Sequence, residues 1–286
     1  DAEAAYHLVT AALKQGKHVV SANKKMIAAH LTELLQLQEE YGVSLLYEAS
    51  VCGSIPVIRN LEEYYDNDLL QSFSGIINGS TNFILTRMRE DQLSYDAALK
   101  LAQEAGYAES DPSLDVEGKD ALNKLTIVLQ HAYGLTCNPN EIVHKGITQL
   151  HALDTRYAEE KGYRIKLVAH AKRNNENEIV AWVLPTLVST DHLLSNVRNE
   201  FNAVCIGSAL ADEQFLYGKG AGRYPTSSAV LSDIAALRYN YRYEYKKSKA
   251  NLNYHLSNEI FLRVYVSYPA GADSIENDFI SVEEKY

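Results

Sequence analysis

Apolar residues in the first fifty positions alternate between helical spacing and short continuous runs. Residues 2–15 carry them three and four positions apart, which predicts an amphipathic helix that ends at Gly16. A short strand is expected at 18–22, a second helix from about 24 to 41 that ends at Gly42, and a second strand at 43–51. Helices and strands that alternate through tight glycine turns predict a parallel sheet.

Two adjacent lysines, Lys24 and Lys25, follow the first predicted strand, and Asn23 before them is a good helix N-cap. Ligands of parallel sheets bind beyond the carboxyl ends of the strands, which is where these lysines are expected. A solvated first helical turn explains the pair more simply, and spacing alone leaves both interpretations open.

The middle of the chain contains a turn that is rich in polar groups. A strand over 70–77 is expected to end at residues 78–81, Asn-Gly-Ser-Thr, which offer N–H groups and hydroxyls to a polar ligand. A helix follows this turn. A clear amphipathic helix comes next, with Ser94 as its N-cap and Gly106 as its stop.

Charge is densest over residues 109–124, directly before an apolar segment. Asp120 and Lys124 are four residues apart, so a helix places them on one face. An exposed ion pair is the simplest interpretation, and Asp115 and Lys119 share the same spacing. Beyond Lys124, however, the helix is apolar nearly all round, and such a helix is buried. Charges that lead into a buried helix need a partner or a function.

Strands are expected again at 164–173, 178–188 and 199–208. The glycines of 218–222 then precede Pro225 and an apolar helix, which is typical of a loop where backbone approaches a ligand. This loop does not match the dinucleotide fingerprint GxGxxG. No strand is expected directly before it in a βαβ unit, and no acidic ribose partner follows.

Every second residue from 239 to 245 is tyrosine. This alternation predicts a strand whose aromatic face packs against a core or a second subunit. Another strand is expected at 259–268, and its continuation into Pro269-Ala270-Gly271 resembles the opening of a small amino-acid-binding regulatory module. Both ends of the chain lack helix caps or turns, so we expect it to be part of a longer polypeptide.

Composition narrows the classes of function. The 286 residues are 46% hydrophobic, which suits one large domain or two interleaved ones. The net charge of −10 disfavours nucleic-acid and membrane partners. No apolar run reaches the roughly 18 residues of a membrane span. Three widely spaced cysteines indicate free thiols in a reducing cytoplasm rather than disulfides or a zinc site: Cys52, Cys137 and Cys205.

Six motifs, taken in order, resemble those of homoserine dehydrogenase, and the resemblance extends from Gly16 to about Leu237. The motifs are SANKKMIA, YEASVCGSIPVI, GIINGSTNFIL, EAGYAESDPSLDVEGKDALNKL, GYRIKLVAHA and GKGAGRYPTSSAVLSDI. The resemblance implies NADH- or NADPH-dependent interconversion of L-aspartate 4-semialdehyde and L-homoserine, on the route to threonine, methionine and isoleucine. It also implies a homodimer and a cytoplasmic location.

The family's catalytic and substrate-binding roles carry over by matched position. Lys124 matches the catalytic lysine, and Asp120 matches a substrate ligand one turn earlier. Glu109 matches the residue that holds the substrate's ammonium group. Lys24 matches a lysine near the nicotinamide and the reacting carbonyl, which implies both catalytic and binding roles.

The resemblance also implies sites for two further ligands. Gly106 and Gly222 match positions where backbone lies against the cofactor. Lys24 and Glu109 match further cofactor-binding positions. A monovalent cation, sodium or potassium, is implied as well, bound mostly by backbone oxygens. Its implied ligands are Glu48, Val51, Gly53 and Ile55.

The expected fold is α/β (α+β): the remainder of a Rossmann-type parallel sheet, plus a mixed-sheet substrate-binding and dimerisation domain with helices on one face. The first unit is assigned to 1–47 with 208–240, and the second to 48–207. Residues 241–286 are expected to form a strand-rich, truncated extension. The family's glycine-rich dinucleotide loop lies before SANKK and is absent from this sequence, so we expect weak cofactor binding.

Residue chemistry agrees with reduction of an aldehyde. Hydride delivery leaves an alkoxide that needs an acid, and a desolvated lysine whose pKa is lowered towards neutrality is a suitable donor. One alternative is a non-catalytic amino-acid-binding or dimerisation fragment. Another is a dehydrogenase of the phosphorylated aldehyde, which needs a cysteine nucleophile. Cys52 is the only thiol near the expected crevice, and we expect it to pack in the core.

Overall fold

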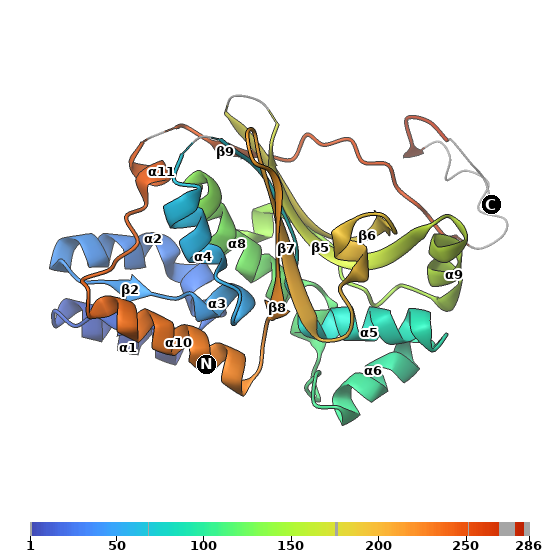
Figure 1. Cartoon of the computed structure of the whole chain (residues 1–286), viewed down its shortest axis with the longest axis horizontal. Coiled ribbons are helices and arrows are strands. Elements are labelled where there is room, and N and C mark those ends of the chain that lie inside the picture. The colour runs from blue at the N-terminus through green and yellow to red at the C-terminus, as the bar shows by residue number, and fades with distance from the viewer. Residues whose placement is uncertain (1, 68, 175–176, 251, 269–277, 283–286) are drawn as a thin grey trace.

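The N-terminal part of the molecule is a two-stranded parallel sheet flanked by helices (Figure 1). The computed structural model describes residues 2–67, 69–174, 177–250, 252–268 and 278–282. The paired strands, their connecting helix and the helix packed beside it are β1 (Val19–Val20), β2 (Leu45–Leu46), α2 (Lys24–Tyr41) and α1 (Ala2–Lys14).

The caps that the sequence predicts for α2 are confirmed. The side chain of Asn23 accepts a hydrogen bond from the N–H of Met26, and Gly42 ends the helix with φ 63°. The strand expected at 43–51 is wrong over its second half, because residues 49–52 wind into α3 (Ala49–Cys52). Lys24 begins α2 directly after β1, at the predicted edge of the parallel pair.

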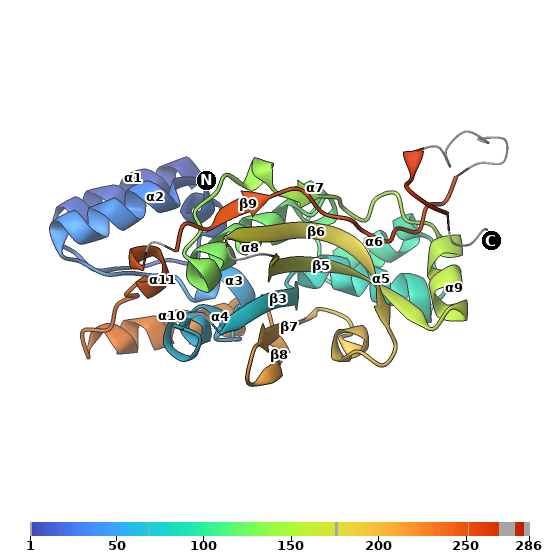
Figure 2. The ribbon, with the colours of Figure 1, turned by 90° about the horizontal axis from the view of Figure 1, so that it is seen from above.

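A larger mixed sheet forms the second part of the molecule, as predicted (Figure 2). Its strand order is β4-β6-β5-β3-β7-β8, with β9 also pairing with β6. Strands β4 and β9 run parallel to β6, and the other pairs are antiparallel. The strands are β3 (Leu70–Ile76), β4 (Val143–His144), β5 (Tyr163–Arg173), β6 (Glu178–Ser189), β7 (Phe201–Ser208), β8 (Asp212–Lys219) and β9 (His255–Ser257).

The two faces of the larger sheet have different cores. One face packs in the main hydrophobic core with α5 (Gly79–Glu90) and α8 (Lys119–Tyr133), while a smaller cluster on the other includes residues of η3 (Leu193–Asn196). Alternate residues of β7 belong to the two clusters, as the strand period requires. The remaining helical segments are α4 (Val57–Arg59), η1 (Asn60–Tyr64), α6 (Tyr95–Glu104), α7 (Ser113–Val116), η2 (Pro139–Glu141), α9 (Ala152–Glu160), α10 (Arg223–Leu237) and α11 (Lys246–Lys249).

Helix α8 is the buried helix that its all-round apolar sequence predicts. Every residue from Asp120 to Tyr133 except Asn123 is buried. The helix therefore carries Asp120 and Lys124 into the interior instead of presenting them to solvent. No helix in the described part of the chain has the length and apolar character needed to cross a bilayer.

A strand that the sequence did not predict leads into the glycine loop at 218–222. This strand, β8, ends at Lys219 and pairs with β7. Half of the residues of β8 are exposed, and its apolar residues, Phe215, Leu216 and Tyr217, are consecutive and do not alternate with polar ones. Strand β8 is antiparallel to its neighbour, so the loop still does not belong to a parallel βαβ unit.

The strand predicted from the alternating tyrosines is wrong. Asn240 and Tyr245 have positive φ, 58° and 50°, which strand backbone does not adopt. The expected packing against a core is confirmed for Tyr243, which is buried, and Tyr245, whose hydroxyl lies 3.2 Å from that of Tyr47.

The strand expected at 259–268 is also wrong, because no strand is present among the described residues after β9. This segment runs past β6 towards α9, where Tyr265 stacks on Tyr157 with 4.3 Å between the ring centres (Figure 2). The described residues of this segment form no β-ladder with a neighbouring strand. The predicted Pro269-Ala270-Gly271 motif lies outside the described residues.

Candidate functional site

The ammonium group of Lys124 is buried at the start of the apolar part of α8. Its Nζ lies 2.8 Å from Oδ2 of Asp120 and donates a hydrogen bond to the carbonyl oxygen of Ile77 at 2.6 Å. The side chain is only 6% exposed. Asp120 and Lys124, four positions apart on the helix, therefore form a buried ion pair. Most ion pairs with this spacing are exposed.

The second carboxylate oxygen of Asp120 binds Lys24. Its Oδ1 lies 2.5 Å from Nζ of Lys24, whose side chain is 41% exposed. Lys24 follows the small parallel sheet, whereas Asp120 belongs to the helix behind the larger sheet. The carboxylate thus joins two ammonium groups from different parts of the molecule, one buried and one open to solvent.

Asn78 orients this carboxylate and was not identified from the sequence as a site residue. Its Oδ1 accepts from the N–H of Thr81 at the start of α5, so its Nδ2 is free to donate. The amide donates to Oδ2 of Asp120 at 2.9 Å and to Oδ1 of Asp115 at 2.7 Å. Its position in the Asn-Gly-Ser-Thr turn was the available signal, but that turn alone did not indicate its partners.

Electrostatics keep the buried pair of Asp120 and Lys124 ionised. Burial raises the pKa of Asp120, but the ammonium groups of Lys124 and Lys24 outweigh it and hold that pKa well below its usual value. Burial lowers the pKa of Lys124, but Asp120 outweighs it and raises that pKa above the ordinary lysine value. The expectation that the pKa of Lys124 is lowered towards neutrality is therefore wrong for the ligand-free site, because desolvation is compensated by a close carboxylate.

Glu109 and Gly106 lie on an exposed loop after α6. The carbonyl oxygen of Glu109 accepts from Gln103 Nε2 at 3.1 Å, and no contact joins its side chain to Lys24, Asp120 or Lys124 among the described residues. Gly106 has φ 75° and open space where a side chain would begin. Of the four charged residues that the resemblance assigns to substrate binding and catalysis, the structure brings three into contact and leaves Glu109 facing solvent.

Gly222 stands directly before α10 with φ 113°, a conformation that favours glycine. The N-terminus of this fifteen-residue helix offers backbone N–H groups suited to an anionic ligand. An open depression lies at the end of β1 and is lined by residues 20–25, including Lys24. These groups fit a dinucleotide's phosphates and its reactive ring.

The glycine loop is held against the segment after α3. Ser54 donates from both its N–H and its hydroxyl to the carbonyl oxygen of Lys219. A Cβ on Gly53 would lie 2.6 Å from the carbonyl oxygen of Gly220, and a Cβ on Gly220 would collide with the buried amide of Asn202. Both glycines are therefore required by close approach of the backbone.

The implied cation ligands lie in α3 and directly before and after it. The carboxylate of Glu48 is buried and accepts from the N–H groups of Ile58 and Arg59, both at 2.9 Å. Burial raises the pKa of Glu48 to about 7, although these N–H groups partly oppose the shift. Because this carboxylate is already occupied, a cation at the implied ligands Glu48, Val51, Gly53 and Ile55 would have to be bound by their backbone carbonyl oxygens.

Cys52 is a poor candidate for a nucleophile. The thiol is fully buried, as expected, and burial raises its pKa to about 12. A reactive cysteine needs a thiolate near neutral pH. This geometry disfavours the cysteine-dependent alternative.

The chain matches two family models. Residues 56–235 match the model described as homoserine dehydrogenase, and residues 1–48 match the model of the homoserine dehydrogenase NAD binding domain. Named homoserine dehydrogenases from Bacillus subtilis and Neisseria gonorrhoeae are 42% and 43% identical over 231 and 226 residues. These matches cover 81% and 79% of this chain, and 53% and 52% of the relatives. The chain thus spans about half the length of the curated relatives it matches.

Solved structures show the same fold. A homoserine dehydrogenase from Thiobacillus denitrificans matches with a TM-score of 0.80 and 39% identity, over 90% of this chain and 58% of that one. A hyperthermophilic archaeal homoserine dehydrogenase in complex with NADPH matches with a TM-score of 0.72 and 29% identity, over 84% and 69% of the two chains. The chain agrees with these relatives in sequence and in fold over most of its length. It therefore belongs to the homoserine dehydrogenase family.

Proposed function

We propose that this chain contains the substrate-binding and proton-transferring part of an enzyme that interconverts L-aspartate 4-semialdehyde and L-homoserine with NADH or NADPH. The observation that carries this proposal is the buried Lys124–Asp120 pair with Lys24 at its solvent side. Two ammonium groups at one carboxylate supply what a carbonyl reduction needs, a proton donor and a positive charge near the developing alkoxide.

A nicotinamide cofactor held near Lys24 and Gly222 would supply the hydride that the aldehyde carbon accepts in the reductive direction, which leaves an alkoxide at the former carbonyl oxygen. Lys124 then donates a proton from its ammonium group to that alkoxide, which gives the hydroxyl of homoserine. Asp120 holds the ammonium in place and keeps it charged before the reaction. In the reverse direction, the neutral amine of Lys124 takes the hydroxyl proton.

The remaining roles concern binding. Lys24 contacts the reacting oxygen and the cofactor from the solvent side, and Asp120 binds the substrate through its carboxylate. Glu109 binds the substrate's ammonium group, which requires its exposed loop to close over the bound substrate. Gly106 and Gly222 let backbone approach the cofactor, with Lys24 and Glu109 beside it. A sodium or potassium ion is bound by backbone oxygens of Glu48, Val51, Gly53 and Ile55.

The proposed domain division assigns 1–47 with 208–240 to cofactor binding, 48–207 to catalysis and dimerisation, and 241–286 to an extension. The resemblance to the family supports a homodimer formed through the domain of the larger sheet. Free cysteines in the described part of the chain are compatible with a reducing cytoplasm.

The direct test is Lys124→Ala in the full product of the gene. Turnover of aspartate 4-semialdehyde is expected to fall by at least about a thousandfold, because the proton donor and a transition-state charge are both removed. Lys119→Ala, an exposed residue on the same helix, is the matched control and is expected to retain turnover. Near-normal turnover of Lys124→Ala, with circular dichroism unchanged, would remove Lys124 from this role.

A thermal-shift experiment separates the enzyme from a non-catalytic amino-acid-binding module. A ligand that binds only the folded state raises Tm, by an amount that grows with the logarithm of its concentration relative to Kd. The enzyme is expected to respond to both NADPH and homoserine, whereas a binding module would respond to the amino acid alone.

A further inference from the structure

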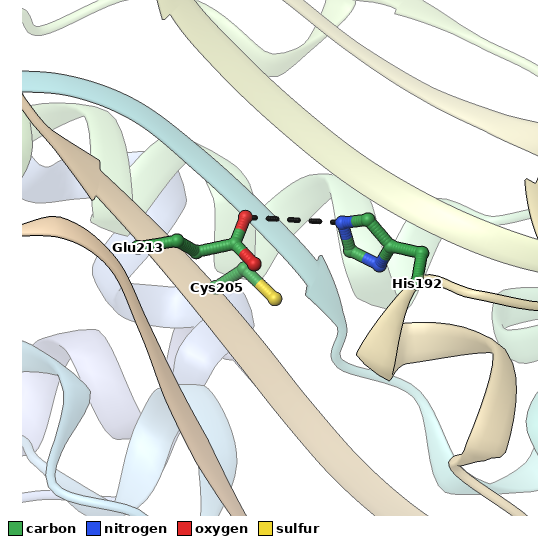
Figure 3. Close-up of side chains that lie close together, drawn as sticks. All are labelled: His192, Cys205 and Glu213. Carbon is green, nitrogen blue, oxygen red and sulfur yellow. Dashed lines mark ion pairs between the residues drawn. The ribbon is translucent and has the colours of Figure 1, made fainter.

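Three potential metal ligands meet on the other face of the larger sheet. One ligand atom from each of His192, Cys205 and Glu213 lies within 4.8 Å of the others (Figure 3). They come from the residue before η3, from β7 and from β8. The set contains nitrogen, sulfur and carboxylate oxygen, which is typical of a Zn²⁺ site.

Strand pairing explains why these side chains converge. Cys205 is opposite Phe215 and Gly207 is opposite Glu213, so Cys205 and Glu213 are diagonal neighbours across β7 and β8. His192 reaches the same place from the turn that η3 lays over this face. No short sequence motif predicts such a set, since its members belong to three separate segments.

The distances leave room for an ion. Nε2 of His192 lies 3.8 Å from Oε2 of Glu213, too far for a direct hydrogen bond. Tetrahedral coordination with bonds of about 2.0–2.3 Å separates ligand atoms by roughly 3.3–3.8 Å. Side-chain adjustments of about 1 Å or less, estimated from that geometry, bring the three atoms to bonding distance.

Charge favours a cation as well. The Cys205 side chain is buried beside the carboxylate of Glu213, whereas His192 and Glu213 are 39% and 45% exposed. A thiolate and a carboxylate at such a distance repel each other, and a divalent cation between them removes that repulsion. The exposed side provides an entry path and room for a water as fourth ligand.

We propose that His192, Cys205 and Glu213 form a Zn²⁺ site that links η3 to the β7–β8 hairpin. On binding, the thiol of Cys205 releases its proton to solvent and the sulfur bonds the metal as thiolate. In the metal-free chain, Nδ1 of His192 accepts from the N–H of Leu194 at 3.1 Å, so Nε2 carries the proton. Coordination through Nε2 moves that proton to Nδ1 and replaces this cap hydrogen bond.

The site is separate from the Lys124–Asp120 pair. Cys205 belongs to the smaller core cluster, whereas Leu125 and other apolar residues of α8 belong to the main one. The inference therefore does not depend on the proposed function and is tested without an activity measurement.

The experiment uses the full 286-residue chain after treatment with a chelator. Titration with Co²⁺ is expected to produce a thiolate-to-cobalt charge-transfer band at one equivalent per chain, which Zn²⁺ displaces. Cys205→Ser is expected to abolish the band, and His192→Gln and Glu213→Gln to weaken Co²⁺ binding at least about tenfold. Cys137→Ser is the control and is expected to keep the band.

A second measurement uses the unaltered chain, in case a variant fails to fold. X-ray absorption at the zinc edge is expected to show one sulfur ligand, with nitrogen or oxygen in the other positions. Zinc coordination without sulfur, a charge-transfer band that survives Cys205→Ser, or no stoichiometric binding would each overturn the proposal.

Discussion

Among the described residues Lys124, Lys166 and Lys247 are buried, and the surroundings of the first two differ in one respect. Lys124 on α8 faces the carboxylate of Asp120 and the carbonyl oxygen of Ile77. Lys166 on β5, also buried, donates instead to Oδ1 of Asn82 at 3.0 Å and to the carbonyl oxygen of Val197. Each ammonium group thus has a side-chain oxygen and a main-chain oxygen, but only one of them has a counter-charge.

The pKa values diverge accordingly. Burial, reinforced by nearby arginines such as Arg89, lowers the pKa of Lys166 to about 7. Asp120 reverses the effect of burial at Lys124 and raises its pKa. Desolvation is common to both sites, so the formal charge on the partner decides whether a buried lysine stays an ammonium group. A proton donor for a carbonyl must be loaded with its proton at neutral pH, and the paired site meets that requirement.

The largest expected effect comes from making the two sites alike. Asp120→Asn leaves Lys124 with an amide oxygen and a carbonyl oxygen, the same partners that Lys166 has. Loss of the buried counter-charge is expected to reduce the free energy of unfolding by roughly 3 kcal/mol at pH 7. Urea denaturation measures this cost, and Glu117→Gln in the exposed pair with Lys119 is the control. A loss below about 1 kcal/mol would contradict the importance given to the counter-charge.

The second prediction concerns Lys166, whose ammonium group donates to neutral oxygens instead of a carboxylate. The folded-state pKa of Lys166 is below the unfolded value of 10.5, so its contribution to stability is present above pH 10.5 and is lost as pH falls through about 7. Between pH 7 and 9 this group is expected to raise the free energy of unfolding with pH, by at most about 1.4 kcal/mol per unit. Lys166→Met removes that slope. Lys172→Met, an exposed position on the same strand, is expected to leave it, and equal slopes in both variants would refute the interpretation.

The third prediction extends the comparison to a buried acid. Glu48 is held by N–H groups without a close ammonium partner like those of Asp120, and its pKa is raised to about 7 from 4.5. Its stabilising contribution is therefore complete below pH 4.5 and is lost as pH rises through 7, with a total on the order of 3 kcal/mol at most. Glu48→Gln is expected to flatten this part of the stability curve, measured by denaturation from pH 5 to 8. Glu40→Gln, at an exposed position on α2, serves as the control. A dependence of stability on pH that Glu48→Gln leaves unchanged would contradict the raised pKa of Glu48.

The smallest effect on stability is expected at Lys24. Its ammonium group is partly exposed and screened by solvent, so Lys24→Ala is expected to change the free energy of unfolding by less than about 1 kcal/mol. Turnover is nevertheless expected to fall by at least about tenfold, because the charge nearest the reacting oxygen is lost. Lys25→Ala is the neighbouring control, and an equal decrease in its turnover would show that Lys24 has no special position.

Several features were predictable from local pattern. The caps Asn23 and Gly42 and the buried character of α8 follow from residue types within a few positions of each other. The shared face of Asp120 and Lys124 follows from helix geometry alone. The tyrosine strand failed because alternation describes side-chain spacing, whereas a strand also needs a neighbour for its N–H and C=O groups.

Long-range contacts explain what was missed. Asn78 joins Asp115 to Asp120 only because α5 starts where α8 begins to enter the core. Strand β8 was overlooked because an edge strand is mostly exposed and has a weak apolar pattern.

Local sequence pattern was therefore sufficient for most of the helices, for the caps of α2 and for the pairing of two charges on one helix. The tertiary structure decided whether those charges meet water or protein, which partner each receives, and that Lys24 reaches Asp120 from another unit. The physical reason is that desolvation and Coulomb energy depend on distance in space and on burial, and neither is set by separation along the chain.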